Sequence, residues 1–316
     1  MRRKRRYSLA GKNVVITGGS RGLGLVLARE CLERGASVAI LARDKFELSR
    51  AHNDLTRNHY RVFAIPCDVT DQAQVLQAFS DIAERLGPVH VLINNAGLIQ
   101  VGPMDSMTVD DYRVSLGVHF WGPLYACLPA LPGMRKRREG RIVNISSIGG
   151  KISVPHLLPY SVGKFALAGL SKGLRAELSN DGVFVTSVFP GLMRTGSSRN
   201  ADFKGQHRAE HTWFSVSASL PGLTVSAERA ARNILDACEQ GRAELIISLA
   251  AKVAARFDHL FPELSSGVMA VAARLLPGPT GNGKKKFKGK ESSSRTSNSW
   301  VTLLSRRAAL KNNEAA

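Results

Sequence analysis

Short apolar runs and longer amphipathic segments alternate along most of the chain. The short runs have the length and the β-branched content of buried strands, and apolar residues recur every three or four positions in the longer segments, as in helices that cover a sheet. The expected strands are Val14–Thr17, Ser37–Leu41, Arg61–Pro66, Val89–Asn94, Gly140–Ser146, Val183–Phe189 and Glu244–Ser248. The expected helices are Leu23–Arg34, Lys45–Asn58, Asp71–Leu86, Val109–Leu128, Tyr160–Leu178 and Ser226–Gln240.

This alternation is typical of α/β proteins, in which helices cover both faces of a parallel sheet. We therefore expect a Rossmann-type, doubly wound parallel sheet of about seven strands. The segment 192–225 has no clear period and lies between the sixth strand and its helix. A connection of this length is usually functional or disordered, and here it would cover the carboxyl edge of the sheet, where ligands bind. Its bulky residues are Phe203, His211, Trp213, Phe214, Leu220 and Leu223.

The formal charge of the 316-residue chain is +19, and much of it lies at the two ends. We divide the chain into a basic arm (1–9), the α/β domain (10–248), a helical extension (249–277) and a basic, largely flexible tail (278–316). The extension carries two short apolar stripes with cationic faces, so it either folds onto the domain or lies at a membrane surface. Nucleic-acid binding is not expected, because only Phe287 and Trp300 are available near the charged ends for base stacking.

Two further features limit where the protein works. Residues 114–134 carry no Asp, Glu, Lys or Arg and are long enough to span a bilayer. Their prolines, and their place between expected strands, favour a buried helix instead. The four cysteines have no CxxC spacing, which fits a reducing compartment and gives no metal or disulfide framework. We expect a cytoplasmic protein, with peripheral contact with a membrane as an alternative.

A glycine-rich turn follows the first expected strand. It reads Thr17-Gly18-Gly19-Ser20-Arg21-Gly22-Leu23-Gly24 and opens a helix. Glycines at such a turn let the backbone approach a diphosphate, which the N–H groups of the following helix then bind. The same turn without a ligand is the alternative, since the motif alone is of moderate specificity.

Four further blocks follow in order, each at the end of an expected strand or the start of an expected helix. They are Asn94-Asn95-Ala96-Gly97, Asn144-Ile145-Ser146-Ser147, Tyr160-Ser161-Val162-Gly163-Lys164 and Pro190-Gly191-Leu192-Met193-Arg194-Thr195. Each block is weak alone. Together with the glycine turn they resemble the larger subtype of the short-chain dehydrogenase/reductase family. The resemblance covers residues 10–248 and leaves out both ends of the chain.

The resemblance implies hydride transfer between a nicotinamide cofactor and an alcohol or carbonyl group. Tyr160 would be the general acid or base, and Lys164, one helical turn away on the same face, its electrostatic partner. A nearby ammonium and an oxidised nicotinamide would lower the pKa of the phenol from about 10. Ser147, thirteen residues before Tyr160, would orient the substrate oxygen. His119 stands where many members have an asparagine in the proton relay, and in that role it would add a pH limb near neutrality.

The resemblance also implies the cofactor contacts. They are Gly18, Ser20, Arg21, Gly22, Leu23, Gly24, Arg43, Asp68, Val69, Asn94, Ala96, Gly97, Tyr160, Lys164, Pro190, Leu192 and Thr195. Members that bind NAD(H) end the second strand with an acid that holds the ribose 2′-OH. Here Ala42 takes that place, and Arg43 and Arg21 bring positive charge to where a 2′-phosphate would lie. We therefore expect NADP(H) rather than NAD(H).

The aromatic residues of the 192–225 segment favour a bulky apolar alcohol or carbonyl substrate. The family commonly pairs the helices expected at Val109–Leu128 and Tyr160–Leu178, which predicts a homodimer or homotetramer. A catalytically weak NADP-binding sensor or scaffold that keeps the fold is the alternative function. The complete Ser147, Tyr160 and Lys164 set argues against it, and His119 argues mildly for it.

Overall fold

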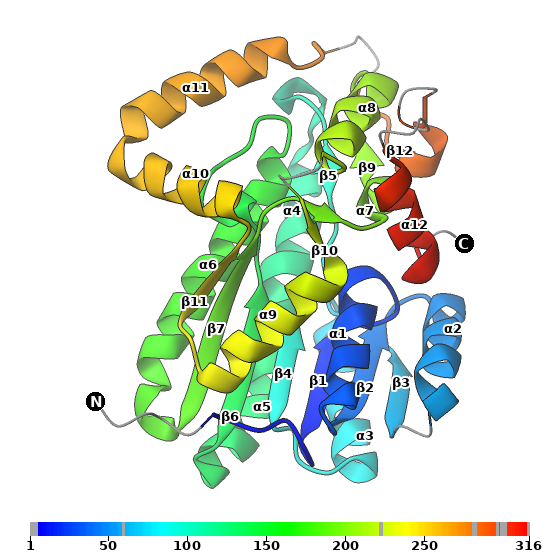
Figure 1. Ribbon diagram of the computed structural model, residues 1–316, viewed down its shortest axis with the longest axis vertical. Helices are drawn as coiled ribbons and strands as arrows, with labels where there is room; N and C mark the ends of the chain where they lie inside the picture. The colour runs from blue at the N-terminus through cyan, green and yellow to red at the C-terminus, as the bar shows by residue number, and fades with distance from the viewer. Residues whose placement is uncertain are drawn as a thin grey trace.

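A parallel sheet of seven strands forms the centre of the computed structural model, which describes residues 6–58, 61–220, 224–279, 283–294, 297 and 302–314. The strand order is β11-β7-β6-β4-β1-β2-β3, and every neighbouring pair is parallel (Figure 1). Their bounds are β1 Asn13–Thr17, β2 Ser37–Ala42, β3 Val62–Pro66, β4 Val91–Asn94, β6 Gly140–Ile145, β7 Val183–Pro190 and β11 Glu244–Ile247. This confirms the predicted fold and all seven strands.

Helices cover both faces of the sheet, so both faces of its central strands are buried. On one face lie α1 (Gly22–Glu33), α2 (Lys45–Leu55) and α9 (Ala227–Gln240). On the other lie α3 (Gln72–Arg85), α5 (Gly122–Arg137) and α6 (Leu158–Glu177). Each face has its own apolar core, and this is why the strands are apolar along their whole length instead of alternating. Short 3₁₀ turns lie at η1 Thr56–Asn58, η2 Met104–Ser106, η4 Ile148–Gly150 and η5 Ser179–Asp181.

The uncharged run forms a nearly continuous helix of three parts. Helix α4 (Val109–Leu116) leads into a π-helical turn, η3 (Gly117–Trp121), and then into α5. Within the described residues, 109–137 is the one helical run long and apolar enough to cross a membrane. It packs against α3 and α6 on the face of the sheet, so the buried part of its apolar surface has protein partners.

The 192–225 segment is built from short elements, although no period predicts them. They are β8 Met193–Arg194, α7 Ser197–Asn200, β9 Asp202–Phe203, α8 His207–Ser217 and β10 Val225–Ser226. Strand β9 pairs with β5 (Gln100–Val101), and Phe203 and Phe214 form a small apolar cluster with Val101. The segment therefore has a core of its own over the carboxyl edge of the sheet. Leu223 lies outside the described residues.

The helical extension forms two helices, α10 (Leu249–Leu260) and α11 (Pro262–Leu275). Helix α10 follows β11 and contacts it, and α11 turns back along α10. The pair extends outward from the edge of the sheet (Figure 1). Only Ala251 of α10 and Ser265 of α11 are fully buried, so most of their apolar side chains remain exposed.

The described parts of the 278–316 tail, which is predicted to be largely flexible, contain short regular elements. Strand β12 (Phe287–Lys288) pairs with β9, a 3₁₀ turn follows at η6 (Gly289–Glu291), and helix α12 covers Leu303–Lys311. Strand pairing and contacts with the α/β domain hold these elements in place, although the local sequence has no helix or strand pattern. In the basic arm, Arg6 pairs with Asp236 and Glu239 of α9. Residues 1–5 and Trp300 lie outside the described residues.

Candidate active site

A large cavity of about 900 Å³ lies at the carboxyl edge of the sheet. Its size is at the upper end of the range for small-molecule sites. Most of the residues predicted to bind the cofactor or to act in catalysis line it. They are Gly18, Ser20, Arg21, Gly22, Leu23, Arg43, Asp68, Val69, Ala96, Gly97, His119, Ser147, Tyr160, Lys164, Pro190, Leu192 and Thr195.

The glycine turn packs tightly on the Asn-Asn-Ala-Gly turn beside it. Gly18 has a positive φ of 66°, and a Cβ there would lie 2.8 Å from the Cα of Ala96. A Cβ on Gly24 would lie only 2.0 Å from the carbonyl oxygen of Gly18, so this glycine serves the packing of the helix against its own loop. Gly24 does not line the cavity, which differs from its predicted contact with the cofactor.

Asn94 is the second residue that the structure places away from the cavity. Its side chain is buried between strands, where its Nδ2 donates to the Oδ1 of Asn144 at 2.8 Å. Its neighbour Asn95 lines the cavity instead, and its Nδ2 donates to the carbonyl oxygens of Thr17 and Gly18. Asn94 is the last residue of the buried strand β4 and Asn95 lies in the turn after it, and the motif alone does not show where the strand ends.

The predicted catalytic side chains meet at the centre of the cavity. Ser147 follows β6, and Tyr160 and Lys164 lie in the first two turns of α6, which starts at the same edge of the sheet. The Nζ of Lys164 donates to the carbonyl oxygen of Ile145 at 2.9 Å and lies 5.6 Å from the centre of the Tyr160 ring. A serine hydroxyl, a phenol and an ammonium thus line the same cavity.

The pKa values in this site are set mainly by burial. Burial raises the pKa of the Tyr160 phenol above its ordinary value, and the hydrogen bond with Ser147 opposes this rise. Burial also lowers the pKa of the Lys164 ammonium to about 7. Removal of the phenolate from water therefore dominates the pKa of Tyr160. The lowering expected from Lys164 together with an oxidised nicotinamide stays a prediction for the cofactor-bound enzyme.

His119 lies within the π-helical turn η3, and such turns occur frequently at functional sites. Its Nε2 accepts a hydrogen bond from the backbone N–H of Leu98 at 3.3 Å, and its Nδ1 lies 3.2 Å from the Oγ of Ser115. The ring meets that of Tyr160 edge-on at 5.4 Å. The side chain is fully buried, and burial holds its pKa well below 6.5. A neutral His119 is therefore expected throughout the working range, which removes the reason for a pH limb near neutrality.

Charged groups surround the end of the cavity where the second strand finishes. Arg43 is 67% exposed and lies 3.7 Å from the carboxylate of Asp68. Arg21 donates to Glu47 at 2.8 Å and to Asn200 at 3.0 Å. Arg43 is thus the freer of the two predicted phosphate ligands, since Arg21 already has a carboxylate partner.

The opposite end of the cavity is apolar. Its lining includes Ile99, Val154 and Leu157 from the body, and Trp213 and Phe214 from α8. Phe203, predicted with them, lies behind in the small apolar cluster.

Three residues of the tail, which no sequence pattern assigns to the site, also line the cavity. They are Lys286, Lys288 and Glu314. Lys288 lies 2.6 Å from Asp202. No periodic or motif signal connects a C-terminal tail with the glycine turn, because the contacts are formed only by the fold.

Known proteins similar to this chain agree with this geometry. Residues 12–204 match the family model described as short chain dehydrogenase. A relative from Anopheles gambiae, "Dehydrogenase/reductase SDR family protein 7-like", is 33% identical over 275 residues and 85% of each chain is covered. A "3-dehydrosphinganine reductase" from Danio rerio is 35% identical over 187 residues, covering 58% of this chain and 56% of the relative.

Solved structures give the same result. A short-chain dehydrogenase/reductase from Burkholderia phymatum in complex with NAD has a TM-score of 0.75 and 26% identity, covering 82% of this chain and 96% of that one. A gluconate 5-dehydrogenase from Burkholderia cenocepacia in complex with NADP and tartrate has a TM-score of 0.68 and 25% identity, covering 78% and 98%. The chain belongs to the short-chain dehydrogenase/reductase family, as an NAD(P)-dependent enzyme that acts on CH–OH and C=O groups.

Proposed function

We propose that the protein is an NADP(H)-dependent oxidoreductase that interconverts an apolar alcohol and the corresponding ketone or aldehyde. The observation that carries this proposal is the position of Ser147, Tyr160 and Lys164. They lie between an apolar end of the cavity and a charged end that carries Arg43. One end suits the substrate and the other suits the adenosine half of a phosphorylated cofactor.

Each of the three central side chains has a distinct part in the reaction. A bound nicotinamide cofactor supplies or accepts the hydride. The Tyr160 hydroxyl gives a proton to the carbonyl oxygen in reduction and takes it back in oxidation. Ser147 donates a hydrogen bond to the same oxygen and stabilises the charge that develops there. Lys164, held by the carbonyl oxygen of Ile145, keeps positive charge near the phenol and favours its anionic form.

The preference for NADP(H) rests on the end of β2. Ala42 offers no carboxylate to a ribose 2′-OH, and Arg43 lies beside it with most of its side chain exposed. A guanidinium binds a phosphate by two parallel hydrogen bonds, whereas NAD(H) offers it no phosphate at this position. Arg43 has only a distant ion pair with Asp68 to give up.

The preference is tested by titrating NADP⁺ and NAD⁺ against the wild type and Arg43→Ala. Loss of one phosphate–guanidinium pair should weaken NADP⁺ by roughly tenfold to a hundredfold, on the scale of a charged hydrogen bond, and leave NAD⁺ unchanged. Arg57→Ala, at an exposed arginine near the end of α2, is the matched control. Equal affinities of the wild type for both cofactors would contradict the assignment.

The apolar end of the cavity supports a bulky apolar substrate. Trp213 and Phe214 of α8 line it and belong to the same apolar cluster as Val154 and Leu157. A panel of ketones from short polar to long-chain or ring-containing ones, with 3-dehydrosphinganine included because a relative carries that name, is assayed by the loss of NADPH absorbance. The ratio kcat/KM should rise with apolar size, and a preference for polar sugars or hydroxy acids would contradict the proposal.

We further propose that the enzyme is cytoplasmic and contacts a membrane surface. The exposed side chains of helices α10 and α11 support this contact. Leu260, Phe261, Leu264 and Val268 are each about half exposed or more. Basic side chains, Lys252, Arg256 and Arg274, are exposed on the same pair of helices. Apolar residues at the headgroup boundary with nearby cations suit an anionic membrane.

The test is sedimentation with vesicles of anionic phospholipid. The wild type should bind, and the variant Leu264→Glu with Val268→Glu should not. Leu76→Glu, which changes an exposed leucine of α3, is the control and should bind like the wild type. Equal binding of the double variant would contradict a role for these helices.

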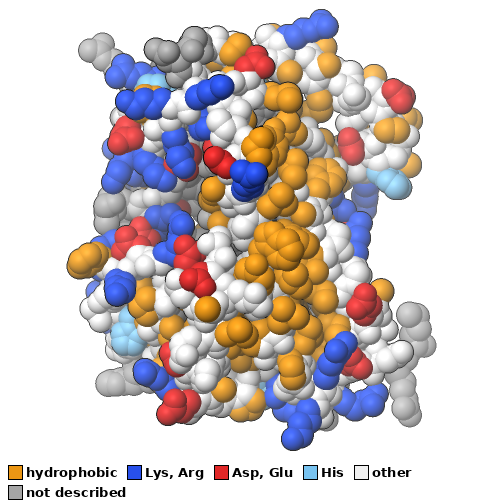
Figure 2. Space-filling model, turned by 180° about the vertical axis from the view of Figure 1, so that it is seen from behind, with side chains coloured by type: hydrophobic (Ala, Val, Ile, Leu, Met, Phe, Trp, Pro, Cys, Tyr) orange, Lys and Arg blue, Asp and Glu red, His pale blue; other side chains and the backbone are white. Residues whose placement is uncertain are grey.

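A second apolar surface supports self-association. Figure 2 shows a hydrophobic band down the face that carries α4, α5 and α6. Its exposed members include Val114 and Trp121 on the α4–η3–α5 run, Leu128 further along it, and Val162 and Phe165 on α6. A contiguous apolar patch on a folded protein usually marks an interface. A homodimer or homotetramer through these helices buries it.

A further inference from the structure

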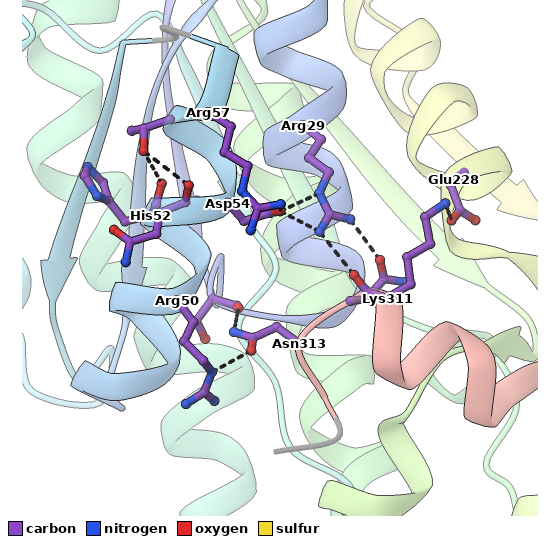
Figure 3. Close-up of polar contacts among 12 residues, drawn as sticks. Arg29, Arg50, His52, Asp54, Arg57, Glu228, Lys311 and Asn313 are labelled. Carbon is purple, nitrogen blue, oxygen red and sulfur yellow. Dashed lines mark hydrogen bonds and ion pairs between the residues drawn. The ribbon is translucent and has the colours of Figure 1, made fainter.

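The end of the chain lies across the glycine turn. After α12, the Oδ1 of Asn313 accepts from the Nε of Arg50 at 2.9 Å, and its Nδ2 donates to the carbonyl oxygen of Ser20 at 2.9 Å (Figure 3). On α1, Arg29 donates to the Oδ1 of Asn312 at 3.0 Å and to the carbonyl oxygen of Lys311 at 3.2 Å. The tail is thus held by polar contacts on both sides of the turn that a dinucleotide uses.

One of these contacts involves the backbone at the start of α1. The N–H of Gly22 donates to the carbonyl oxygen of Asn312 at 2.9 Å. In Rossmann folds the first N–H groups of this helix bind the diphosphate of the cofactor, because they have no partner within the helix. The tail therefore takes a donor that the diphosphate needs.

Glu314 fills the space beside this donor. Its side chain is only 7% exposed, and its Oε2 accepts a hydrogen bond from the N–H of Gly196 at 2.6 Å. A Cβ on Gly22 would lie 3.0 Å from the Oε1 of Glu314, so the carboxyl group rests directly on the glycine turn. A diphosphate and this carboxyl group cannot occupy the same place.

The contacts that hold α12 are suited to release. Only Ser305 and Ala309 of the helix are fully buried, whereas Leu303, Leu304 and Leu310 are 41–73% exposed. The other anchors are polar. Some are buried, such as Ser305 to Ser219 at 2.8 Å, and others lie at the surface, such as Lys311 to Glu228 at 2.8 Å. Detachment of the helix therefore loses little apolar burial, and a segment of this kind opens at low cost.

We propose that residues 302–314 form an autoinhibitory arm, which occupies the diphosphate subsite and must leave before NAD(P)(H) binds. The arm and the cofactor compete for the same N–H groups and the same space. The measured dissociation constant is then the intrinsic one divided by the fraction of molecules whose arm is open. If nine molecules in ten are closed, removal of the contacting residues lowers Kd about tenfold.

The test compares the full chain with a variant that ends at Lys311, which keeps α12 and removes Asn312 to Ala316. A second variant of full length carries a Gly-Ser repeat in place of 312–316. Binding of NADP⁺ and of NAD⁺ is measured by calorimetry, so the result does not depend on which of the two is preferred or on any substrate. We expect Kd to fall about tenfold for both cofactors in both variants.

An equal or higher Kd in either variant overturns the proposal, since the tail would then be neutral or would clamp the cofactor. Hydrogen exchange on the full chain gives an independent measurement that needs no variant. Saturation with cofactor should speed exchange of the backbone amides of 303–311. Greater protection of these amides would likewise overturn it.

Discussion

Replacing Lys164 by methionine should abolish turnover and at the same time stabilise the fold. Lys164 is 4% exposed, and burial lowers the pKa of its ammonium from 10.5 to about 7. A pKa change of this size corresponds to roughly 5 kcal/mol of unfavourable free energy in the folded state, at 1.36 kcal/mol per pKa unit. The lost hydrogen bond to Ile145 offsets about 1–2 kcal/mol of this gain. The variant should therefore be more stable by about 3 kcal/mol below neutrality.

The stability gained by Lys164→Met depends on pH, and the lowered pKa of Lys164 fixes the direction of this dependence. Below pH 7 the lysine is charged in both states, so the folded state bears the full cost. As pH rises from 7 to 10.5 the unfolded chain still binds the proton while the folded chain does not, so the wild type becomes relatively more stable. The advantage of Lys164→Met should be about 3 kcal/mol at pH 6.5 and close to zero at pH 9.5.

Urea unfolding at these two pH values measures the effect. Lys172→Met, which changes an exposed lysine two turns further along α6, is the matched control and should alter stability by no more than about 0.5 kcal/mol at either pH. A Lys164→Met variant that is equally stable or less stable at pH 6.5 would refute the reasoning, because the lysine would then not be a strained buried charge.

Four further results are expected. Tyr160→Phe should lose about two to four orders of magnitude in kcat while keeping cofactor affinity, and near-normal turnover would contradict the whole site. His119→Asn should leave the shape of the kcat–pH profile unchanged between pH 6 and 9, since the pKa of the buried imidazole lies well below 6.5; loss of a limb near neutrality would show that it titrates. Trp121→Glu should give a monomer by light scattering, and an unchanged mass would exclude this face as the interface. Burial raises the pKa of Glu314, which Arg21 and Glu47 face, to about 7. Closure of the arm therefore binds a proton, and the closed state becomes less favourable as pH rises from about 4.5 to 7. Over that range Kd for NADP⁺ should fall more in the full chain than in the chain that ends at Lys311, and parallel profiles would contradict this linkage.

The sequence alone was sufficient to predict the strands of the sheet and to select the candidate catalytic residues. Apolar runs such as Val14–Thr17 are buried on both faces, and that requirement is visible in the composition of the run itself. Tyr160 and Lys164 are one helical turn apart, so local geometry places them together whatever the rest of the chain does.

The tertiary structure decided what depends on register, burial and distant contacts. Two adjacent asparagines stand in one motif, yet Asn94, the last residue of β4, lies in the core, and Asn95, in the turn after it, lines the cavity. Burial raises the pKa of Tyr160, and the sequence could not show this effect, because desolvation has no signature in a linear pattern. The tail from Asn312 to Glu314 reaches the glycine turn across nearly 300 residues of chain, through hydrogen bonds that leave no periodicity in the sequence. These groups meet only in the folded protein, because contacts between distant residues depend on the three-dimensional path of the backbone and not on the local order of residues.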